Sequence, residues 1–293
     1  MPRGLSGRRV VQIGGNKARL LSDAAPHARM HTRGGTHAHS FMTTPNSSAA
    51  SPATAKTISI NDLRVHCSKC SMRELCLPFG LAANEVEELY AIIGNRVKLK
   101  KGEPLFRNGS PFTALYAIRV GSLKTTMLSD DGREQIAGYH MPGDILGLDG
   151  MSTRHHECEA VALEDAEACL IPFERHEEIS RKLPALQHSL HRVLGREIDR
   201  DHRQLLLLGS MRAEERLAAF LLNLSERYKS RGYSSTEYVL RMTREEIGSY
   251  LGLKLETVSR LFSRFQEEGL VQVQGRAVKI VDLPRLKQLA GLR

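Results

Sequence analysis

The stretch from residue 242 to residue 281 constrains the fold of this 293-residue chain more than any other part. Thr243 and Glu246 have the T-x-x-E spacing of a capping box, which starts a helix by satisfying its free backbone N–H groups. Gly252 ends that helix in a short turn, and a second helix is expected from about Leu255 to Glu268. Two helices joined by a short glycine turn predict a helix-turn-helix.

The second helix of this pair has two faces of opposite character. Its apolar face is expected to be buried and consists of Val258, Leu261, Phe262 and Phe265. Glu256, Ser259 and Arg260 have i, i+3, i+4 spacing, so they share another face in the half of the helix that meets base edges. Arginine can bond O6 and N7 of guanine together, and glutamate can accept from N4 of cytosine, so this face is expected to read DNA.

Two short apolar segments follow the second helix. Leu270 to Gln274 and Ala277 to Val281 flank Gly275-Arg276, a pattern typical of a β-hairpin. A hairpin in this place forms a wing, in which Arg276 and Lys279 could touch phosphate. An ordinary surface helix and hairpin is the alternative. The capping box, turn, polar face and wing in series favour a DNA-binding domain over residues 211–293.

Turn signals dominate the middle of the chain. Between residues 97 and 173, glycine-containing turns separate short apolar stretches such as Ala114 to Arg119 and Ser122 to Met127. Many short strands at regular spacing indicate a β-roll or barrel, and we expect a β-roll sensor domain over residues 81–180. A short helix from Asn84, as its N-cap, to Ile93 is expected at the start of that domain.

A long helix is predicted over residues 181–210, beginning near Pro184, because proline suits the first helical turn. Alternating steps of four and three residues, which are typical of a coiled-coil seam, separate Leu194, Ile198, Asp201, Leu205 and Leu208. Four arginines flank this seam: Arg192, Arg196, Arg200 and Arg203. A helix packed only on its own domain is the alternative, but the narrow seam favours a dimerisation helix.

Three of the five cysteines, Cys67, Cys70 and Cys76, lie together in a segment expected to form a loop over residues 56–80. An odd count with close spacing indicates metal or redox chemistry in a reducing compartment rather than a disulfide framework. Zinc and iron–sulfur sites normally need four ligands, so a fourth must come from Cys158 or Cys169. The spacing alone does not separate zinc from iron–sulfur.

The N-terminal segment differs in composition from the rest of the chain. Residues 1 to 41 carry seven basic residues against a single acid, Asp23, and supply most of the net charge of +9. Residues 1–55 are rich in small and polar residues without apolar periodicity, so we expect them to be disordered or a mis-annotated extension. In the second case Met42 is the true start. A transit peptide is a less favoured interpretation.

The string from Glu256 to Arg260 resembles the recognition helix of the FNR branch of the CRP/FNR superfamily. Residues 213–218 and 247–253 are similar to the same family, and the resemblance extends from about residue 62 to the end. It implies an α+β fold: a cyclic-nucleotide-binding-like jelly roll, a long dimerisation helix and a C-terminal winged helix-turn-helix. It also implies a homodimer that reads a TTGAT-like inverted repeat, works with RNA polymerase to activate or repress anaerobic-metabolism genes, and contacts DNA through Glu256, Thr257, Ser259 and Arg260.

The same resemblance implies an oxygen-labile [4Fe-4S] cluster on Cys67, Cys70, Cys76 and one distant cysteine. Cys169 stands before Ile171-Pro172-Phe173-Glu174, as the distant ligand does in that family, and Cys158 does not. Cys158 is therefore expected to be a small buried side chain, and His66 to be incidental. Burying the two Asp201 carboxylates at the twofold axis would leave the dimer only marginally stable. The bound cluster would fix the loop against the roll and supply the missing stability.

Other functions fit the sequence less well. Cyclic-nucleotide binding is not expected, since no Arg-Ser pair follows Gly143-Asp144. A zinc- or thiol-based redox sensor on the same scaffold is the main alternative. No nucleotide-binding loop, nucleophile elbow or H-E-x-x-H motif indicates an enzyme, and His155-His156 are expected on an exposed loop. No apolar run approaches ~20 residues, so a cytoplasmic protein is expected.

Overall fold

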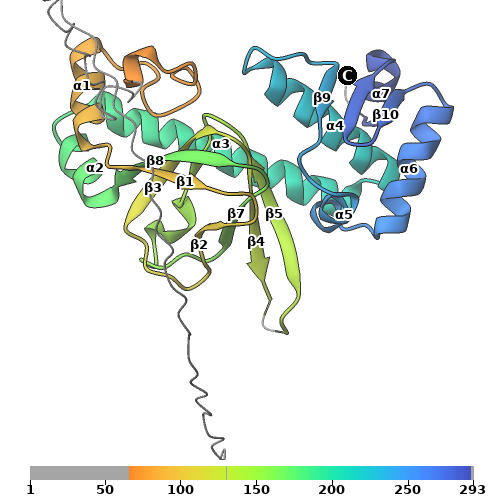
Figure 1. The fold of residues 1–293 in the computed structure, drawn as a ribbon, viewed down its shortest axis with the longest axis horizontal. Coiled ribbons are helices and arrows are strands. Elements are labelled where there is room, and N and C mark those ends of the chain that lie inside the picture. The colour runs from red at the N-terminus through yellow and green to blue at the C-terminus, as the bar shows by residue number, and fades with distance from the viewer. Residues whose placement is uncertain (1–65, 130, 292–293) are drawn as a thin grey trace, which may run out of the picture. The chain divides into compact units, whose positions relative to one another are not determined.

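The computed structural model describes residues 66–129 and 131–291, which belong to one compact unit, Ile58–Arg293 (Figure 1). The expected N-terminal extension, 1–55, and Met42 lie outside the described residues. The first helix, α1 (Ala83–Ile92), starts earlier than expected. Its N-cap is Ala82, whose backbone N–H donates to Glu85 Oε2 at 2.7 Å, so the prediction of Asn84 as N-cap is wrong. A carboxylate reaching back from the first turn satisfies the free donor instead.

Eight antiparallel strands form two four-stranded sheets in the described part of the β-rich region, ordered β1-β8-β3-β6 and β2-β7-β4-β5. The strands are β1 (Arg96–Leu99), β2 (Pro104–Phe106), β3 (Ala114–Val120), β4 (Leu123–Leu128), β5 (Glu134–His140), β6 (Ile145–Leu146), β7 (Glu159–Ala162) and β8 (Ala166–Pro172). Apolar residues such as Ile118 and Leu123 meet between the sheets and are almost completely buried, whereas Leu115 is buried in a second cluster against α1 and α3. These strands are called the roll below.

A single long helix, α3 (Pro184–Ser210), leaves the roll after the short α2 (Phe173–Ser180) and reaches the C-terminal elements (Figure 1). Proline occupies its first turn as expected. Leu186, Leu190 and Val193 are buried in the same cluster as the roll, whereas Leu207 is buried in the C-terminal cluster. One helix therefore joins two hydrophobic cores.

The predicted seam of α3 is largely open. Ile198 and Leu205 are 53% and 68% exposed, and Asp201 is exposed too. Leu194 is half-buried and packs against the roll cluster, and Leu208 packs against the C-terminal cluster. Exposed leucine and isoleucine in a row on a helix are costly in water, so the middle of the seam has the character of an interface.

The C-terminal elements form a module around one core cluster, which Ile136 and Tyr139 of the roll also join. Its elements are α4 (Ala213–Lys229), β9 (Glu237–Val239), α5 (Arg244–Leu251), α6 (Leu255–Glu267), β10 (Val271–Gln274), β11 (Ala277–Ile280) and α7 (Leu283–Leu289). The sheet order is β10-β11-β9, so the expected hairpin gains a third strand that the sequence pattern did not indicate. The expected α+β architecture, with a roll, a long helix and a winged helix-turn-helix, is confirmed.

Candidate DNA-reading face and cysteine site

The capping box that starts α5 is present as predicted. Thr243 Oγ1 accepts from Glu246 N at 3.1 Å, and Thr243 N donates to Glu246 Oε2 at 2.7 Å. Gly252 ends the helix with φ of +63°, a conformation that glycine adopts without strain. A Cβ at Gly252 would also lie 3.2 Å from Arg216 Nη1 and from Leu208 Cδ2, so the close approach of α3 and α4 favours glycine here.

The two faces of α6 separate as the sequence predicts. Val258, Leu261, Phe262 and Phe265 are buried, and the helix begins at Leu255. Glu256, Ser259 and Arg260 are all exposed, and Thr257 beside them is half-buried. Lys254 at the N-cap makes no side-chain capping bond, so the first backbone N–H groups of α6 remain available to an anion such as phosphate.

The wing carries one cation at its turn and one on its strand. Arg276 is exposed between β10 and β11, whereas Lys279 pairs with Glu237 of β9 at 2.5 Å. The ion pair is exposed, and such a pair contributes about 0–1 kcal/mol, so phosphate can compete for the lysine. Both residues therefore remain suited to a backbone contact.

Three cysteines lie on the loop before α1 and one lies in the roll. Cys67 opens a short 3-10 turn, Cys70 and Cys76 follow, and Cys169 lies within β8. All four line one small cavity of about 30 Å³, whose other walls include Met72, Leu77, Ala117 and Ile171. A second hollow of about 180 Å³ adjoins Cys67 and Cys169. The structure thus brings together all four cysteines that were predicted as ligands.

The environment of these cysteines opposes free thiolates. Burial, with the neighbouring Cys169 and Cys70, raises the pKa of Cys67 to about 12. Burial also raises the pKa of the thiols of Cys76 and Cys169. A metal centre would reverse this order, because its positive charge deprotonates a coordinating thiol. Within the described residues, no three His, Cys, Asp or Glu side chains gather tightly enough to hold a single metal ion.

The cysteine loop, residues 66–81, is tied to α3 by three side chains. Ser189 Oγ donates to Leu77 O at 2.6 Å, and Arg192 donates to Phe79 O at 2.9 Å. Arg196 donates to Leu75 O at 2.9 Å. The sequence pattern placed both arginines only as flanks of the seam. Their bonds to the cysteine loop could not be predicted, because the carbonyls that accept them lie more than a hundred residues away in sequence.

Cys158 lies apart from this site and is buried, as expected. Its Sγ donates to Asp149 Oδ2 at 3.3 Å, and burial next to that carboxylate raises the pKa of the thiol. Neighbouring His156 is also buried and stacks on Phe106 with ring centroids 3.8 Å apart. The prediction of an exposed loop is therefore wrong for His156, because its ring fills a gap in the core, and it holds only for His155. His66 bonds Ser68 and pairs with Glu87.

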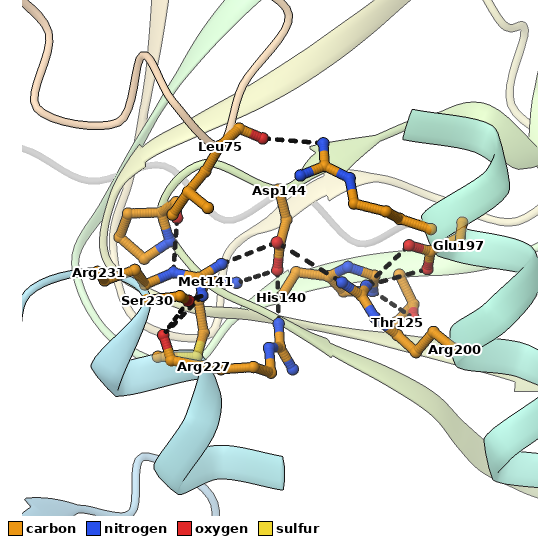
Figure 2. Close-up of polar contacts among 12 residues, drawn as sticks. Leu75, Thr125, His140, Met141, Asp144, Glu197, Arg200, Arg227, Ser230 and Arg231 are labelled. Carbon is orange, nitrogen blue, oxygen red and sulfur yellow. Dashed lines mark hydrogen bonds and ion pairs between the residues drawn. The ribbon is translucent and has the colours of Figure 1, made fainter. Parts of the chain in front are cut away.

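A buried ion cluster, which the sequence did not reveal, joins the roll to the module (Figure 2). Asp144, in the turn before β6, pairs at 2.5 Å with Arg227 of α4 and at 2.8 Å with Arg231, which lies just after the end of α4. Arg200 of α3 lies 3.6 Å from the same carboxylate. Burial raises the pKa of Asp144, but attraction by the three guanidinium groups outweighs this, so its pKa is well below the ordinary value.

The β4–β5 hairpin makes a second contact with the module. Lys124 pairs with Glu246 of α5 at 2.8 Å, and the backbone N–H of Ile136 donates to Ser249 Oγ at 3.0 Å. Gln135 also donates to the backbone carbonyl of Ser249. Both helices of the helix-turn-helix are therefore linked to the roll, α5 directly and α6 through its packing on α5.

Two family models match the chain. The cyclic nucleotide-binding domain matches residues 96–182, and the Crp-like helix-turn-helix domain matches residues 215–289. Within the described residues, no helix has both the length and the apolar character needed to cross a membrane.

Several curated proteins are similar over most of their length. The transcriptional regulatory protein btr of Bordetella pertussis is 53% identical over 226 residues, which cover 77% of this chain and 93% of that protein. The transcriptional activator protein anr of Pseudomonas aeruginosa is 47% identical over 81% of this chain and 98% of its own. The solved structure of FixK2 from Bradyrhizobium japonicum matches with a TM-score of 0.62 and 31% identity, over 67% of this chain and 96% of that one. The chain therefore belongs to the CRP/FNR family of DNA-binding transcription regulators, on its FNR branch.

Proposed function

We propose that this regulator responds to oxygen through a [4Fe-4S] cluster held by Cys67, Cys70, Cys76 and Cys169. The observation that carries the proposal is that these four thiols, three from one loop and one from a distant strand, line a single cavity. The name "anaerobic regulatory protein", given to a relative from Haemophilus influenzae that is 44% identical, supports the same function.

The donor set fits an iron–sulfur cluster. Four cysteine thiolates are the usual ligands of [4Fe-4S], and the cavity walls are otherwise mostly apolar, which limits access of water. A single zinc ion would need all four sulfurs about 2.3 Å from one point, and the described side chains show no such tight grouping. The wider arrangement favours a larger centre over one zinc ion.

The residues around the loop give the site a connection to α3. When bound, the cluster would supply an oxygen-sensitive link between the cysteine loop and β8. Ser189, Arg192 and Arg196 bond the loop carbonyls, so the placement of the loop and of α3 are coupled. Loss of the link would weaken these bonds to α3, which precede the exposed seam residues Ile198 and Leu205 on the same helix.

The same proposal assigns the output. The exposed face of Glu256, Ser259 and Arg260, with Thr257 beside it, reads a TTGAT-like half-site, and Arg276 contacts phosphate. Two copies pair along α3 and so present two recognition helices to an inverted repeat. The dimer works in the cytoplasm with RNA polymerase to activate or repress genes of anaerobic metabolism, and it needs no cyclic nucleotide. Its seam residues are Leu194, Ile198, Asp201 and Leu205.

Anaerobic purification tests the proposal. Protein isolated without air is expected to be brown and to contain about four iron and four acid-labile sulfide per chain, because the sites bind one cluster each. Its affinity for an inverted-repeat DNA duplex is expected to fall on exposure to air. Protein with stoichiometric zinc, or with an air-induced disulfide and no iron, would contradict the cluster and favour a zinc- or thiol-based sensor.

A further inference from the structure

We propose that Asp144 is a positioning residue through which the roll sets the placement of the DNA-reading module, and that the cysteine loop acts on it through Leu75. The first part depends only on the ion cluster in Figure 2. The second part rests on the function proposed above, because it makes the cysteine loop the origin of the signal.

Asp144 is fixed firmly to the roll. Its backbone N–H donates to Met141 O at 3.0 Å, and its Oδ2 accepts from Met141 N at 2.9 Å. The backbone N–H of Ile118 in β3 donates to Asp144 O at 3.0 Å. Because both the backbone and the carboxylate are bonded inside the roll, the carboxylate moves only if this turn moves.

The same carboxylate holds the end of α4. Arg231 donates to Asp144 Oδ1 at 2.8 Å and to Pro142 O at 2.7 Å, and its side chain is only 4% exposed. Arg227 donates to Asp144 Oδ2 from the preceding turn of α4. Since α4 packs on both α5 and α6, a shift at its end is passed to the helices that face DNA.

The contact between α4 and the roll depends on the negative charge of Asp144. The largely buried Asp144 carboxylate faces three guanidinium groups, of which only that of Arg200 has a second carboxylate partner, Glu197 at 2.8 Å. Asp144 therefore offsets the repulsion between Arg227 and Arg231 as well as bonding them. A buried charge left without its partner is strongly unfavourable, unlike a broken pair on the surface. Without the carboxylate, Arg227 and Arg231 are expected to turn toward water and release the end of α4.

The cysteine loop reaches this turn through Leu75, which lies between Cys70 and Cys76. Its side chain packs directly on Gly143, since a Cβ at Gly143 would lie 2.7 Å from Leu75 Cβ. Gly143 also has φ of +93°, which glycine tolerates. The carbonyl of Leu75, which is labelled in Figure 2, accepts from Arg196 of α3 at 2.9 Å. Movement of the cysteine loop would therefore shift the Leu75 side chain that packs on Gly143, the residue next to Asp144.

The test uses the full-length protein with Asp144→Asn, which keeps the shape and removes the charge. DNA affinity on an inverted-repeat duplex is expected to fall about 10-fold, within the usual 5- to 150-fold range of coupling between sites. Hydrogen exchange in residues 225–231 is expected to rise. Unchanged affinity with unchanged exchange would overturn the proposal, and so would tighter DNA binding, because the contact would then restrain the module in a non-binding position. If Asp144→Asn does not fold, Arg231→Lys serves, since it keeps the charge and loses the bond to Pro142 O.

A double-mutant cycle tests the loop. Leu75→Ala is expected to raise exchange in residues 225–231 in the wild-type background and to add little in the Asp144→Asn background. Leu105→Ala is the matched control, because Leu105 is also half-buried but packs against the cluster between the two sheets, which contains Phe106 and Ile118. Equal effects of Leu75→Ala in both backgrounds, or none in either, would overturn the role of the loop. Iron and sulfide content is measured in each protein, so absence of a cluster would contradict the proposed function while the Asp144 result stands or fails by itself.

Discussion

Cys169 of β8 lies directly opposite Arg96 of β1 in the antiparallel register of the first sheet, with Ala117 of β3 on its other side. Burial raises the pKa of the Cys169 thiol, and the Arg96 charge partly offsets this. One proposed ligand therefore has a position fixed by strand pairing. The other three lie on a loop of turns, whose place depends on side-chain bonds from α3.

Thiol reactivity in the metal-free protein should show the effect of burial. The pKa of Cys67 is raised from 9.0 to about 12, so its thiol stays protonated in the folded state at pH 9 to 12, where the unfolded chain would release the proton. The free energy of unfolding is therefore expected to fall as pH rises through this window. At pH 8, alkylation of Cys67 is expected to be much slower in the folded protein than in urea. Mass spectrometry of iodoacetamide-treated protein measures the rates. Equal rates in native and denatured protein would refute the buried site.

The seam of α3 predicts how dimerisation responds to charge. Replacing Asp201 by alanine removes two like charges that face each other across a twofold interface, and such a juxtaposition costs up to several kcal/mol, so the dimer is expected to be tighter. Replacing Leu205, which is 68% exposed in the chain, by serine should weaken the dimer. Sedimentation equilibrium of the air-exposed protein gives both constants. A dimer unaffected by either change would place the interface elsewhere.

Two arginines of the module should affect DNA binding in different ways. Arg260→Ala removes a candidate bidentate contact, so it should cost roughly 1–3 kcal/mol on the preferred half-site and little on altered sites. Arg276→Ala should weaken binding to all sequences alike and reduce the slope of log affinity against log salt by about one. Fluorescence anisotropy at several salt concentrations separates the two. Uniform weakening by Arg260→Ala would remove it from the base-reading face.

Arg216 is predicted to hold the hinge between α3 and the module. Its guanidinium donates to Leu208 O at 2.8 Å, Met211 O at 2.9 Å and Leu251 O at 2.9 Å, so it bonds the C-terminal ends of α3 and α5 together. Lysine cannot reproduce this planar fork. Arg216→Lys should therefore cost about 2 kcal/mol of stability, seen as a lower unfolding midpoint.

Arg175→Lys is the control for that measurement, because Arg175 bonds only Glu178 among the interactions described, on the surface of α2. It should change the free energy of unfolding by only a fraction of a kcal/mol and so leave the midpoint nearly unchanged. Equal midpoints for the two variants would show that the three carbonyl bonds contribute nothing to the hinge.

Features with local causes were predictable from the sequence. The capping box of Thr243 and Glu246, the positive φ of Gly252 and the buried face of α6 follow from residue chemistry and helical spacing. The start of α3 at Pro184 has the same kind of cause. The third strand of the wing was missed, because β9 has three residues and too few positions to show an alternating pattern.

Features that depend on distant contacts were not predictable. Asp144 is separated from Arg227 and Arg231 by more than eighty positions, and nothing near it in sequence indicates a buried partner. Arg196 was interpreted only as a flank of the seam, although it also bonds the cysteine loop. His156 is polar and follows another histidine, yet its ring is buried on Phe106. In each case tertiary packing decides the role of the side chain.

A matched pair of substitutions tests the cysteine site most directly. Cys169→Ser and Cys158→Ser each remove one buried or half-buried thiol from the roll, but only Cys169 lines the cavity of the other three. Iron and acid-labile sulfide per chain are measured in both proteins after anaerobic purification. Both are expected to be lost in Cys169→Ser and to stay at wild-type content in Cys158→Ser. Full iron and sulfide in Cys169→Ser, or their loss in Cys158→Ser alone, would contradict the proposed ligand set.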